Sequence, residues 1–337
     1  MVSKSASPYR IFHSSLSSML HFFLKPLIIL LAMFCLFDAP AWGLNVNELI
    51  LKELKENGTR LDLRHSGAIG DEGAKQLAKS HLLKNLRFLG LRAHNIGDEG
   101  AQALASSPYL QNLESLNLFY GTIGPDGAQS IASSKNLRRL KYLGLWGNQI
   151  GKEGGRALGE STTLTELESL DLTGSQIGSE GARAIANSST LKNLKELRLR
   201  QNKLGDKGVE LLALSPYLRS LEILDLSENS FGPRAMEALA KAEWIENLKE
   251  LVLQKNQIGD QGLKALVGRS LSLQKLDLQW NKITLTGAKA LASSTGLRKL
   301  KFLELWGNFI EEEGVRVIQG SKNLQQVMTP IYPGDPG

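Results

Sequence analysis

The feature that most constrains this chain is a period of about 27 residues that recurs from Leu61 onward. Each of ten copies contains a Leu-x-Leu pair, and the first leucines of successive pairs stand 28 residues apart once, 27 apart six times in succession, and then 25 and 27 apart. These leucines are Leu61, Leu89, Leu116, Leu143, Leu170, Leu197, Leu224, Leu251, Leu276 and Leu303. Such a period is typical of a stacked array, in which each unit buries its apolar side against its neighbours.

The first half of each copy is expected to be a short strand followed by a turn. In the best-formed copy, Leu143 and Leu145 point to the same side of an extended chain, because successive side chains alternate between faces. Asn148 follows where the chain turns, and its amide is expected to satisfy backbone groups that the turn buries. Other residues take the asparagine position in earlier copies, namely Ser66, His94, Gly121 and Ser175.

The second half of each copy predicts one short amphipathic helix. In residues 178–187 apolar positions recur at spacings of three and four, and Gly181, Ala182 and Ala186 are small enough for close helix packing. Strands stack about 4.8 Å apart and helices about 8 to 10 Å apart, so the array must curve with its strands inside. We therefore expect an α/β fold: a right-handed horseshoe solenoid of about ten repeats, with a parallel concave sheet and convex helices.

The combined pattern Leu-x-x-Leu-x-Leu-x-x-Asn-x-Ile-Gly-x-x-Gly-Ala-x-x-Leu-Ala resembles a known repeat family. It is similar to the leucine-rich repeat of the ribonuclease-inhibitor type, in particular its Gly-Ala-Leu-Ala bacterial variant, over residues 58–328. The resemblance implies a fold that binds other proteins, but one fold serves many partners. The family also contains the Ran GTPase-activating protein, and no GTPase-activating residue maps onto a matching position of this chain.

The segment before the repeats is predicted to be a signal peptide over residues 1–43. Leu27 to Phe37 is an uncharged apolar run that follows Lys25, and small residues at Ala41 and Gly43 suit cleavage after Gly43. Met19 is an alternative start. The alternative interpretation is a membrane anchor over residues 19–37, for which the apolar run is short. Cleavage would place the mature chain outside the cytoplasm, either secreted or in the cell envelope (periplasmic or extracellular).

The rest of the chain divides into three predicted parts. Residues 44–58 are expected to form an N-terminal capping helix, residues 59–328 the repeat domain, and residues 329–337 a flexible tail that contains three prolines. The chain carries a net charge of +6. Three cations and one anion lie within the first 43 residues, so the remainder carries +4, interleaved along the repeats. This pattern gives no reason to expect a nucleic-acid partner.

Candidate binding residues lie at strand positions that point away from the leucine core. Aromatic side chains gather at these positions, and exposed aromatic residues are common anchors of protein interfaces. The predicted partner-binding residues are Phe88, Arg92, Phe119, Tyr120, Tyr142, Trp146, Arg200, Trp280, Phe302 and Trp306. The alternative is that these rings only cover gaps in a curved sheet. Between the two aromatic groups lies a polar stretch formed by Asp171, Glu196, Arg198, Arg200, Asp225 and Glu228.

Catalytic and metal-binding motifs are not found in the sequence. It has no Gly-x-Ser-x-Gly elbow and no phosphate-binding loop, and its one cysteine, Cys35, lies in the leader. His65 and His94 fall on adjacent repeats, but no carboxylate or cysteine at ligand spacing accompanies them. We expect neither an enzyme nor a bound metal or small-molecule cofactor.

The predicted function is recognition of a macromolecule, a protein or a glycan, along the concave face of an exported repeat domain. Two alternatives remain open at this stage. One is a cytoplasmic regulator that resembles the Ran GTPase-activating protein, which requires an uncleaved leader. The other is a structural envelope protein without a specific partner. Any contact with a membrane would depend on an uncleaved leader.

Overall fold

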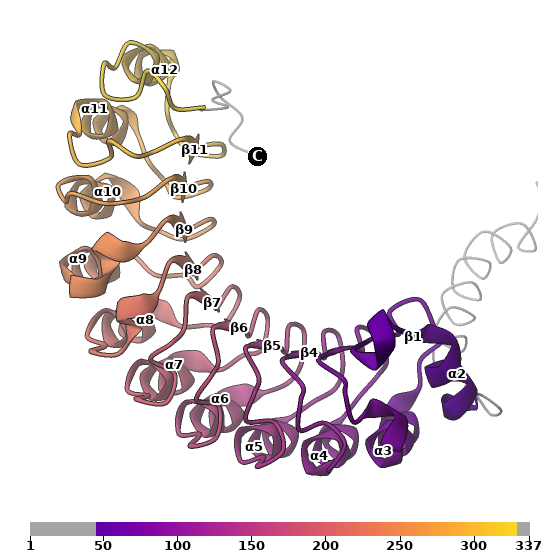
Figure 1. Ribbon diagram of the computed structural model, residues 1–337. Helices are drawn as coiled ribbons and strands as arrows, with labels where there is room; N and C mark the ends of the chain where they lie inside the picture. The colour runs from indigo at the N-terminus through magenta and orange to yellow at the C-terminus, as the bar shows by residue number, and fades with distance from the viewer. Residues whose placement is uncertain (1–44, 329–337) are drawn as a thin grey trace, which may run out of the picture. The chain divides into compact units, whose positions relative to one another are not determined.

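The computed structural model describes residues 45–328, so the predicted signal peptide and C-terminal tail lie outside the described residues. Within this range the strands form one sheet of eleven, whose order in space equals their order in the sequence (Figure 1). They are β1 (Leu54–Lys55), β2 (Arg60–Asp62), β3 (Phe88–Gly90), β4 (Ser115–Asn117), β5 (Tyr142–Gly144), β6 (Ser169–Asp171), β7 (Glu196–Arg198), β8 (Ile223–Asp225), β9 (Glu250–Val252), β10 (Lys275–Asp277) and β11 (Phe302–Glu304). β1 pairs antiparallel with β2, and all later pairs are parallel.

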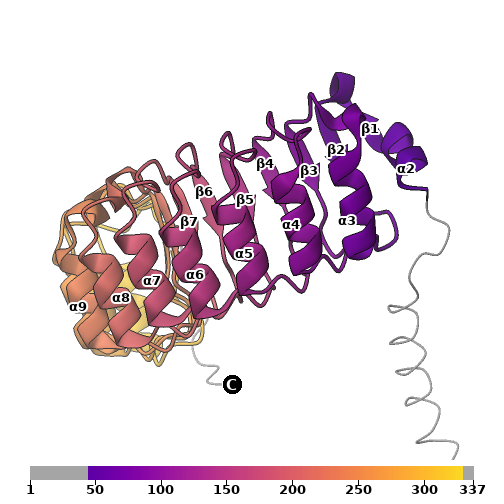
Figure 2. The same cartoon turned by 90° about the horizontal axis from the view of Figure 1, so that it is seen from below.

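A helix follows almost every strand and lies on the opposite side of the repeat (Figures 1 and 2). The helices of the described residues are α2 (Val46–Glu53), α3 (Gly70–Lys79), α4 (Asp98–Ser106), α5 (Pro125–Ala132), α6 (Gly151–Gly159), α7 (Gly178–Ala186), α8 (Gly205–Ala213), α9 (Pro233–Lys241), α10 (Gly259–Val267), α11 (Leu285–Ser293) and α12 (Glu312–Gln319). Residues 45–328 therefore form an open arc with the sheet on its inner side, which confirms the predicted solenoid (Figure 1).

The core lies between the sheet and the helices. Leu143 and Leu145 of the best-formed copy are fully buried, and the leucine pairs of the other copies are buried in the same way. The parallel register places each first leucine beside the next, as in Leu116 beside Leu143. A core built from one layer per repeat has no thick centre, so each layer is stabilised mainly by its two neighbours.

The predicted asparagine ladder is present. The Asn148 amide nitrogen donates to the Leu118 and Leu145 carbonyl oxygens at 2.8 and 2.9 Å, and its oxygen accepts from the Ile123 backbone N–H at 3.0 Å. Where histidine replaces asparagine, His94 Nε2 lies 2.7 Å from the Leu63 oxygen. His94 is buried, as expected of a ladder substitute.

Two further hydrogen-bond ladders join neighbouring repeats and were not predicted. A buried serine after each of several helices donates to the end of the preceding helix, as Ser107 Oγ does to the Ala78 oxygen at 2.6 Å. An aspartate at the start of some helices accepts backbone N–H groups of the next repeat. Asp98 Oδ1 accepts from Gly124 and Gly127 at 2.7 and 2.8 Å. Both ladders satisfy backbone groups at helix ends, which lack partners inside the helix.

Each end of the described array carries an additional element. At the start, the Asn45 side chain caps α2 by accepting from the Asn47 and Glu48 backbone N–H groups. At the other end, Met328 pairs with Phe302 as an isolated parallel bridge and extends the sheet beyond β11. Among residues 45–328, no helix has the length and apolar character needed to span a bilayer.

Candidate interaction face

The inner face of the arc is formed by the strand residues that alternate with the buried leucines and by the two residues after each pair. These side chains project away from the core, because the leucines between them point inward. Their chemistry changes along the array. An aromatic group lies on β4 and β5, a polar group on β6 to β9, and a second aromatic group on β10 and β11.

The first group, which we call the N-terminal aromatic patch, comprises Phe119, Tyr120, Tyr142 and Trp146. The Trp146 ring contacts Phe119 edge-on at a centroid distance of 5.5 Å and Tyr120 at 4.8 Å. Tyr120 is 40% exposed, and the other three are partly buried. Burial raises the pKa of Tyr142 to about 12, so this phenol is neutral at physiological pH. The Tyr142 hydroxyl and the Phe119 ring both lie against Gly144, so the four side chains form one aromatic surface that carries two phenol hydroxyls.

The C-terminal aromatic patch comprises Trp280, Phe302 and Trp306. Trp280 and Trp306 meet edge to face with ring centroids 4.7 Å apart. Phe302 and Trp306 are each 41% exposed, which is unusual for large apolar side chains in a folded protein. The sequence prediction grouped these three residues, and the structure places them on neighbouring strands.

Both patches have the same local design. An aromatic residue occupies a left-handed backbone position, Tyr120 at φ 56° and Trp280 at φ 57°, and the next repeat contributes a tryptophan followed by glycine. Gly147 and Gly307 lie beneath these two rings, and a Cβ on Gly147 would come within 2.7 Å of Tyr120. A bulky residue at positive φ is strained, so the aromatic residues are held there despite a backbone preference for glycine.

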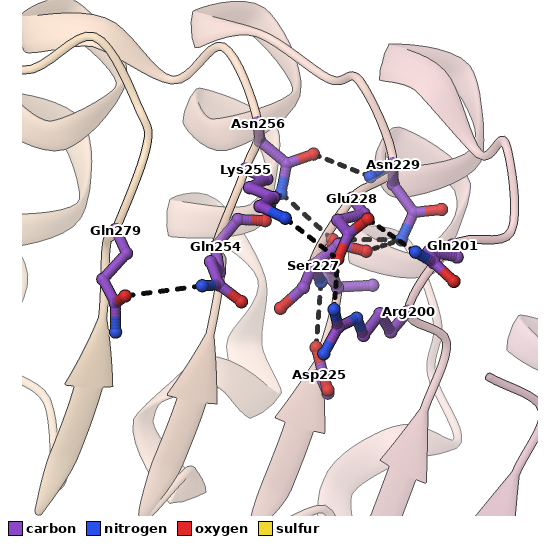
Figure 3. A network of polar contacts seen from close by, with 11 residues as sticks. Arg200, Gln201, Asp225, Ser227, Glu228, Asn229, Gln254, Lys255, Asn256 and Gln279 are labelled. Atoms are coloured by element: carbon purple, nitrogen blue, oxygen red, sulfur yellow. Dashed lines mark hydrogen bonds and ion pairs between the residues drawn. The ribbon is translucent and has the colours of Figure 1, made fainter. Parts of the chain in front are cut away.

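The polar stretch between the patches is largely paired within itself (Figure 3). Arg200 forms an ion pair with Glu228, and Gln201 Nε2 donates to the same carboxylate at 2.6 Å. Burial would raise the pKa of Glu228, but these hydrogen bonds outweigh it and hold the pKa below its ordinary value. On β7, in the same repeat as Arg200, Arg198 Nε donates to Glu196 at 2.5 Å. Asp171 and Asp225 form no ion pair within residues 45–328 but lie on either side of Arg198, so the charges of this stretch are largely compensated within it.

Three predicted residues lie in smaller contacts rather than in the centre of either patch. Phe88, on β3, lies under the Arg60 guanidinium, 3.7 Å from the ring centroid. Arg92 lies 5.2 Å from the Tyr120 ring centroid and borders the N-terminal patch. Arg200 belongs to the polar stretch through its pair with Glu228. Cation–π contacts of this kind fix the ring orientation and keep the charge at the surface.

Sequence reasoning missed several features of this face. Asp277 and Glu304 are the last residues of β10 and β11 and lie directly beside the C-terminal patch. Phe309, 55% exposed, lies further along the last repeats. The sequence does contain one pattern that indicates the two patches: the tetrapeptide Leu-Trp-Gly-Asn begins at Leu145 and again at Leu305.

No group of three or more histidine, cysteine or acidic side chains in residues 45–328 is arranged to hold a metal. His94 is buried and engaged with the Leu63 carbonyl, and burial lowers its pKa, which favours the neutral ring. His65 is exposed at the first repeat. The histidine pair considered from the sequence is therefore explained in part by the ladder.

The fold and the exposed inner sheet define a class of protein, the open repeat solenoid. Comparison with known sequences identifies the family: the chain belongs to the leucine-rich repeat family. The family profile, described as a leucine-rich repeat, matches residues 59–78, 83–105, 109–132, 136–159, 161–186, 190–213, 217–240, 246–267 and 269–292. Leucine-rich repeat domains are generally non-enzymatic scaffolds that bind proteins. No curated protein sequence matches this chain.

Comparison with solved structures found chains that are similar to this one. A chain of the yeast Rad7 and Elc1 complex is 17% identical with a TM-score of 0.50, over 90% of this chain and 84% of that one. A leucine-rich repeat protein of Leptospira interrogans is 23% identical with a TM-score of 0.48, and the match covers 74% of this chain and 56% of that protein. A TDR receptor is 21% identical with a TM-score of 0.41, over 76% and 44% respectively.

Proposed function

We propose that this protein is an exported recognition module that binds a protein partner along the inner face of its repeat array. The observation that carries the proposal is the pair of exposed aromatic patches, each built from an aromatic residue in a left-handed position and a Trp-Gly dipeptide. Interfaces concentrate their binding energy in such aromatic anchors, and neighbouring polar residues set orientation. The repeat pattern further suggests the ribonuclease-inhibitor type of the family and its bacterial variant.

The two patches lie far enough apart to favour a macromolecular partner over a small ligand. Trp146 follows β5 and Trp306 follows β11, so six strand spacings of about 4.8 Å, or roughly 29 Å along the sheet, separate them. An extended peptide would need about nine residues to reach from one to the other. A folded protein can contact both at once. A glycan remains a second candidate, because flat exposed rings also stack on sugars.

Export is supported by the leader sequence alone. The apolar run from Leu27 to Phe37 and the small residues Ala41 and Gly43 match a cleavable signal. N-terminal sequencing of the protein purified from its native cells is expected to read from Leu44. A chain that begins at Met1 or Met19 would instead favour a membrane anchor or the cytoplasmic regulator that resembles the Ran GTPase-activating protein.

The binding proposal is tested by truncating the two tryptophans. Trp146→Ala and Trp306→Ala are each expected to weaken capture of the partner from native extracts by about 2 kcal/mol, or roughly thirtyfold. The folded state should persist, because both side chains are partly exposed. Leu214→Ala serves as the control, since Leu214 is 79% exposed at the end of α8. Unchanged capture by both tryptophan variants would contradict the proposal.

A further inference from the structure

The two aromatic patches share one backbone design but differ in the charge between their rings. In the N-terminal patch, the last residues of the two strands involved, β4 and β5, are Asn117 and Gly144. In the C-terminal patch, the equivalent positions on β10 and β11 hold Asp277 and Glu304. At the same place in the repeat, the C-terminal patch therefore has two carboxylates where the N-terminal patch has an asparagine amide and a glycine without a side chain.

Asp277 and Glu304 lie side by side on the inner face. Their Cα atoms are register partners in the parallel pair β10–β11, and neighbouring strands are about 4.8 Å apart. Asp277 is 9% exposed and Glu304 is partly buried. Burial raises the pKa of Asp277, and the neighbouring charge of Glu304 raises it further, although the Gln279 backbone N–H opposes the shift.

Neither carboxylate has a cationic partner within the described residues. Asp277 accepts only from Gln279, at 3.0 Å from the backbone N–H and 3.4 Å from Nε2. Lys275, on the same strand, is bound to Glu250 at 2.8 Å; its charge acts on Asp277, but the two side chains form no ion pair. At the equivalent position of other strands, Asp171 and Asp225 lie on either side of Arg198 on β7, and Glu228 is paired with Arg200. Two adjacent carboxylates without a cation are electrostatically costly, which indicates that the cation comes from elsewhere.

Aromatic rings border this carboxylate pair on both sides. Phe302 precedes Glu304 by two residues and Trp306 follows it by two, so both project to the same face as Glu304. Trp280 completes the border through its contact with Trp306. An acidic floor bordered by aromatic faces combines the two interactions that a guanidinium forms best, paired hydrogen bonds to carboxylates and stacking on rings.

We propose that the C-terminal aromatic patch, with Asp277 and Glu304, binds an arginine side chain of the protein partner. The inference rests on the proposed function and adds the chemistry of the partner residue. Guanidinium is favoured over ammonium because it is planar, stacks on tryptophan and presents parallel N–H groups to two acceptors. The N-terminal patch has Asn117 and Gly144 at these two positions and is bordered by Arg92, and Asp171, the next carboxylate along the sheet, lies beside Arg198. This patch therefore takes an uncharged apolar anchor instead.

The test uses short peptides of defined sequence and the full chain. The probe is a five-residue peptide, acetylated and amidated, with arginine at its centre, leucine on each side and glycine at both ends. The matched control has glutamine at the centre. Binding is followed by the NMR shifts of the Trp280 and Trp306 indole N–H groups. The arginine peptide is expected to bind about tenfold more tightly than the glutamine peptide.

Two variants locate this preference. The double variant Asp277→Asn with Glu304→Gln keeps the shape of the patch and is expected to remove the preference for arginine. Trp146→Ala leaves the C-terminal patch intact and is expected to retain it. Equal binding of both peptides to the native chain, or an unchanged preference in the double variant, would overturn the inference.

The outcome is separable from that of the proposed function. If Trp306→Ala abolishes partner capture while the carboxylate variant captures normally and shows no loss of peptide preference, the inner face binds a partner but the arginine assignment fails. If neither tryptophan variant affects capture, the proposed function fails whatever the peptides show. Circular dichroism of each variant checks that the fold is retained.

Discussion

At the scale of single residues, the glycines under the aromatic rings are the most specific feature of the inner face. Gly174 and Gly307 have similar left-handed backbones, with φ 65° and 73°. A Cβ at Gly307 would overlap the Trp280 ring, whereas a Cβ at Gly174 would meet no atom closer than 3.9 Å. Alanine substitutions at these two glycines therefore separate the energetic cost of the backbone conformation from the cost of displacing the Trp280 ring.

Gly174→Ala is expected to lower the free energy of unfolding by about 1 kcal/mol, because alanine is disfavoured at positive φ. Gly307→Ala carries the same backbone cost, and it should lower the free energy of unfolding further and weaken partner capture, since the Trp280 ring must move. Chemical denaturation and capture assays measure the two effects. Equal losses of stability in both variants, with unaffected capture, would show that the seating of Trp280 has no role in binding.

Asp277 predicts a pH dependence of stability. Its pKa is raised in the folded state, so the folded protein binds the proton more tightly than the unfolded chain does. The associated stability is present below the unfolded pKa near 4 and is lost as pH rises through the raised folded pKa. Asp277→Asn should therefore stabilise the protein at pH 7 and have little effect near pH 3. Glu160→Gln, at an exposed position, is the control. A destabilised Asn variant at pH 7 would contradict this account.

How far single residues were predictable depended on whether they follow the period. Asn148 and the leucine pairs recur in phase, so the sequence alone predicted their roles. Asp277 and Glu304 were missed because each looks like an ordinary polar residue until the register aligns them. Arg200 was grouped with the binding residues, whereas its pairing with Glu228 emerges only from the contacts between repeats.

At the scale of elements, the outer helices are held by close approaches that small residues permit. The Gly155 position of α6 lies against Gly181 and Ile177, and a Cβ on Gly159 would overlap the backbone at Ala184 of α7. Figure 2 shows these helices side by side on the outer surface. The spacing of small residues predicted this packing. The serine and aspartate ladders at the helix ends were not predicted, because each of their hydrogen bonds joins two different repeats and the sequence pattern was analysed within one repeat.

Gly159→Ala tests that packing. In an isolated helix this change would stabilise by up to about 1 kcal/mol, because alanine is the better helix former. Here the overlap with the α7 backbone reverses the sign, and we expect a loss of about 1 to 3 kcal/mol in the free energy of unfolding. Gly67→Ala, at an open position with no atom within 4 Å, should change stability little. Stabilisation by Gly159→Ala would show that α6 and α7 pack less closely than described.

At the scale of the whole molecule, the repeat places two similar aromatic patches on one continuous surface and separates them by an internally paired polar stretch. The period predicted the solenoid and its inner face, because every layer repeats the same strand and helix. It could not predict the identity of a partner, because the side chains of the inner face do not repeat from copy to copy as the buried leucines do. Those positions carry the differences between this chain and others of its fold.

The most direct test of the central claim asks which face touches the partner. A photo-crosslinking benzophenone residue is placed at Val252, the last residue of inner strand β9, or at Arg183, exposed on outer helix α7. After illumination in native extract, the account predicts a discrete adduct from position 252, reduced in the presence of Trp306→Ala, and none from position 183. An adduct from position 183 in place of position 252 would contradict recognition by the inner face.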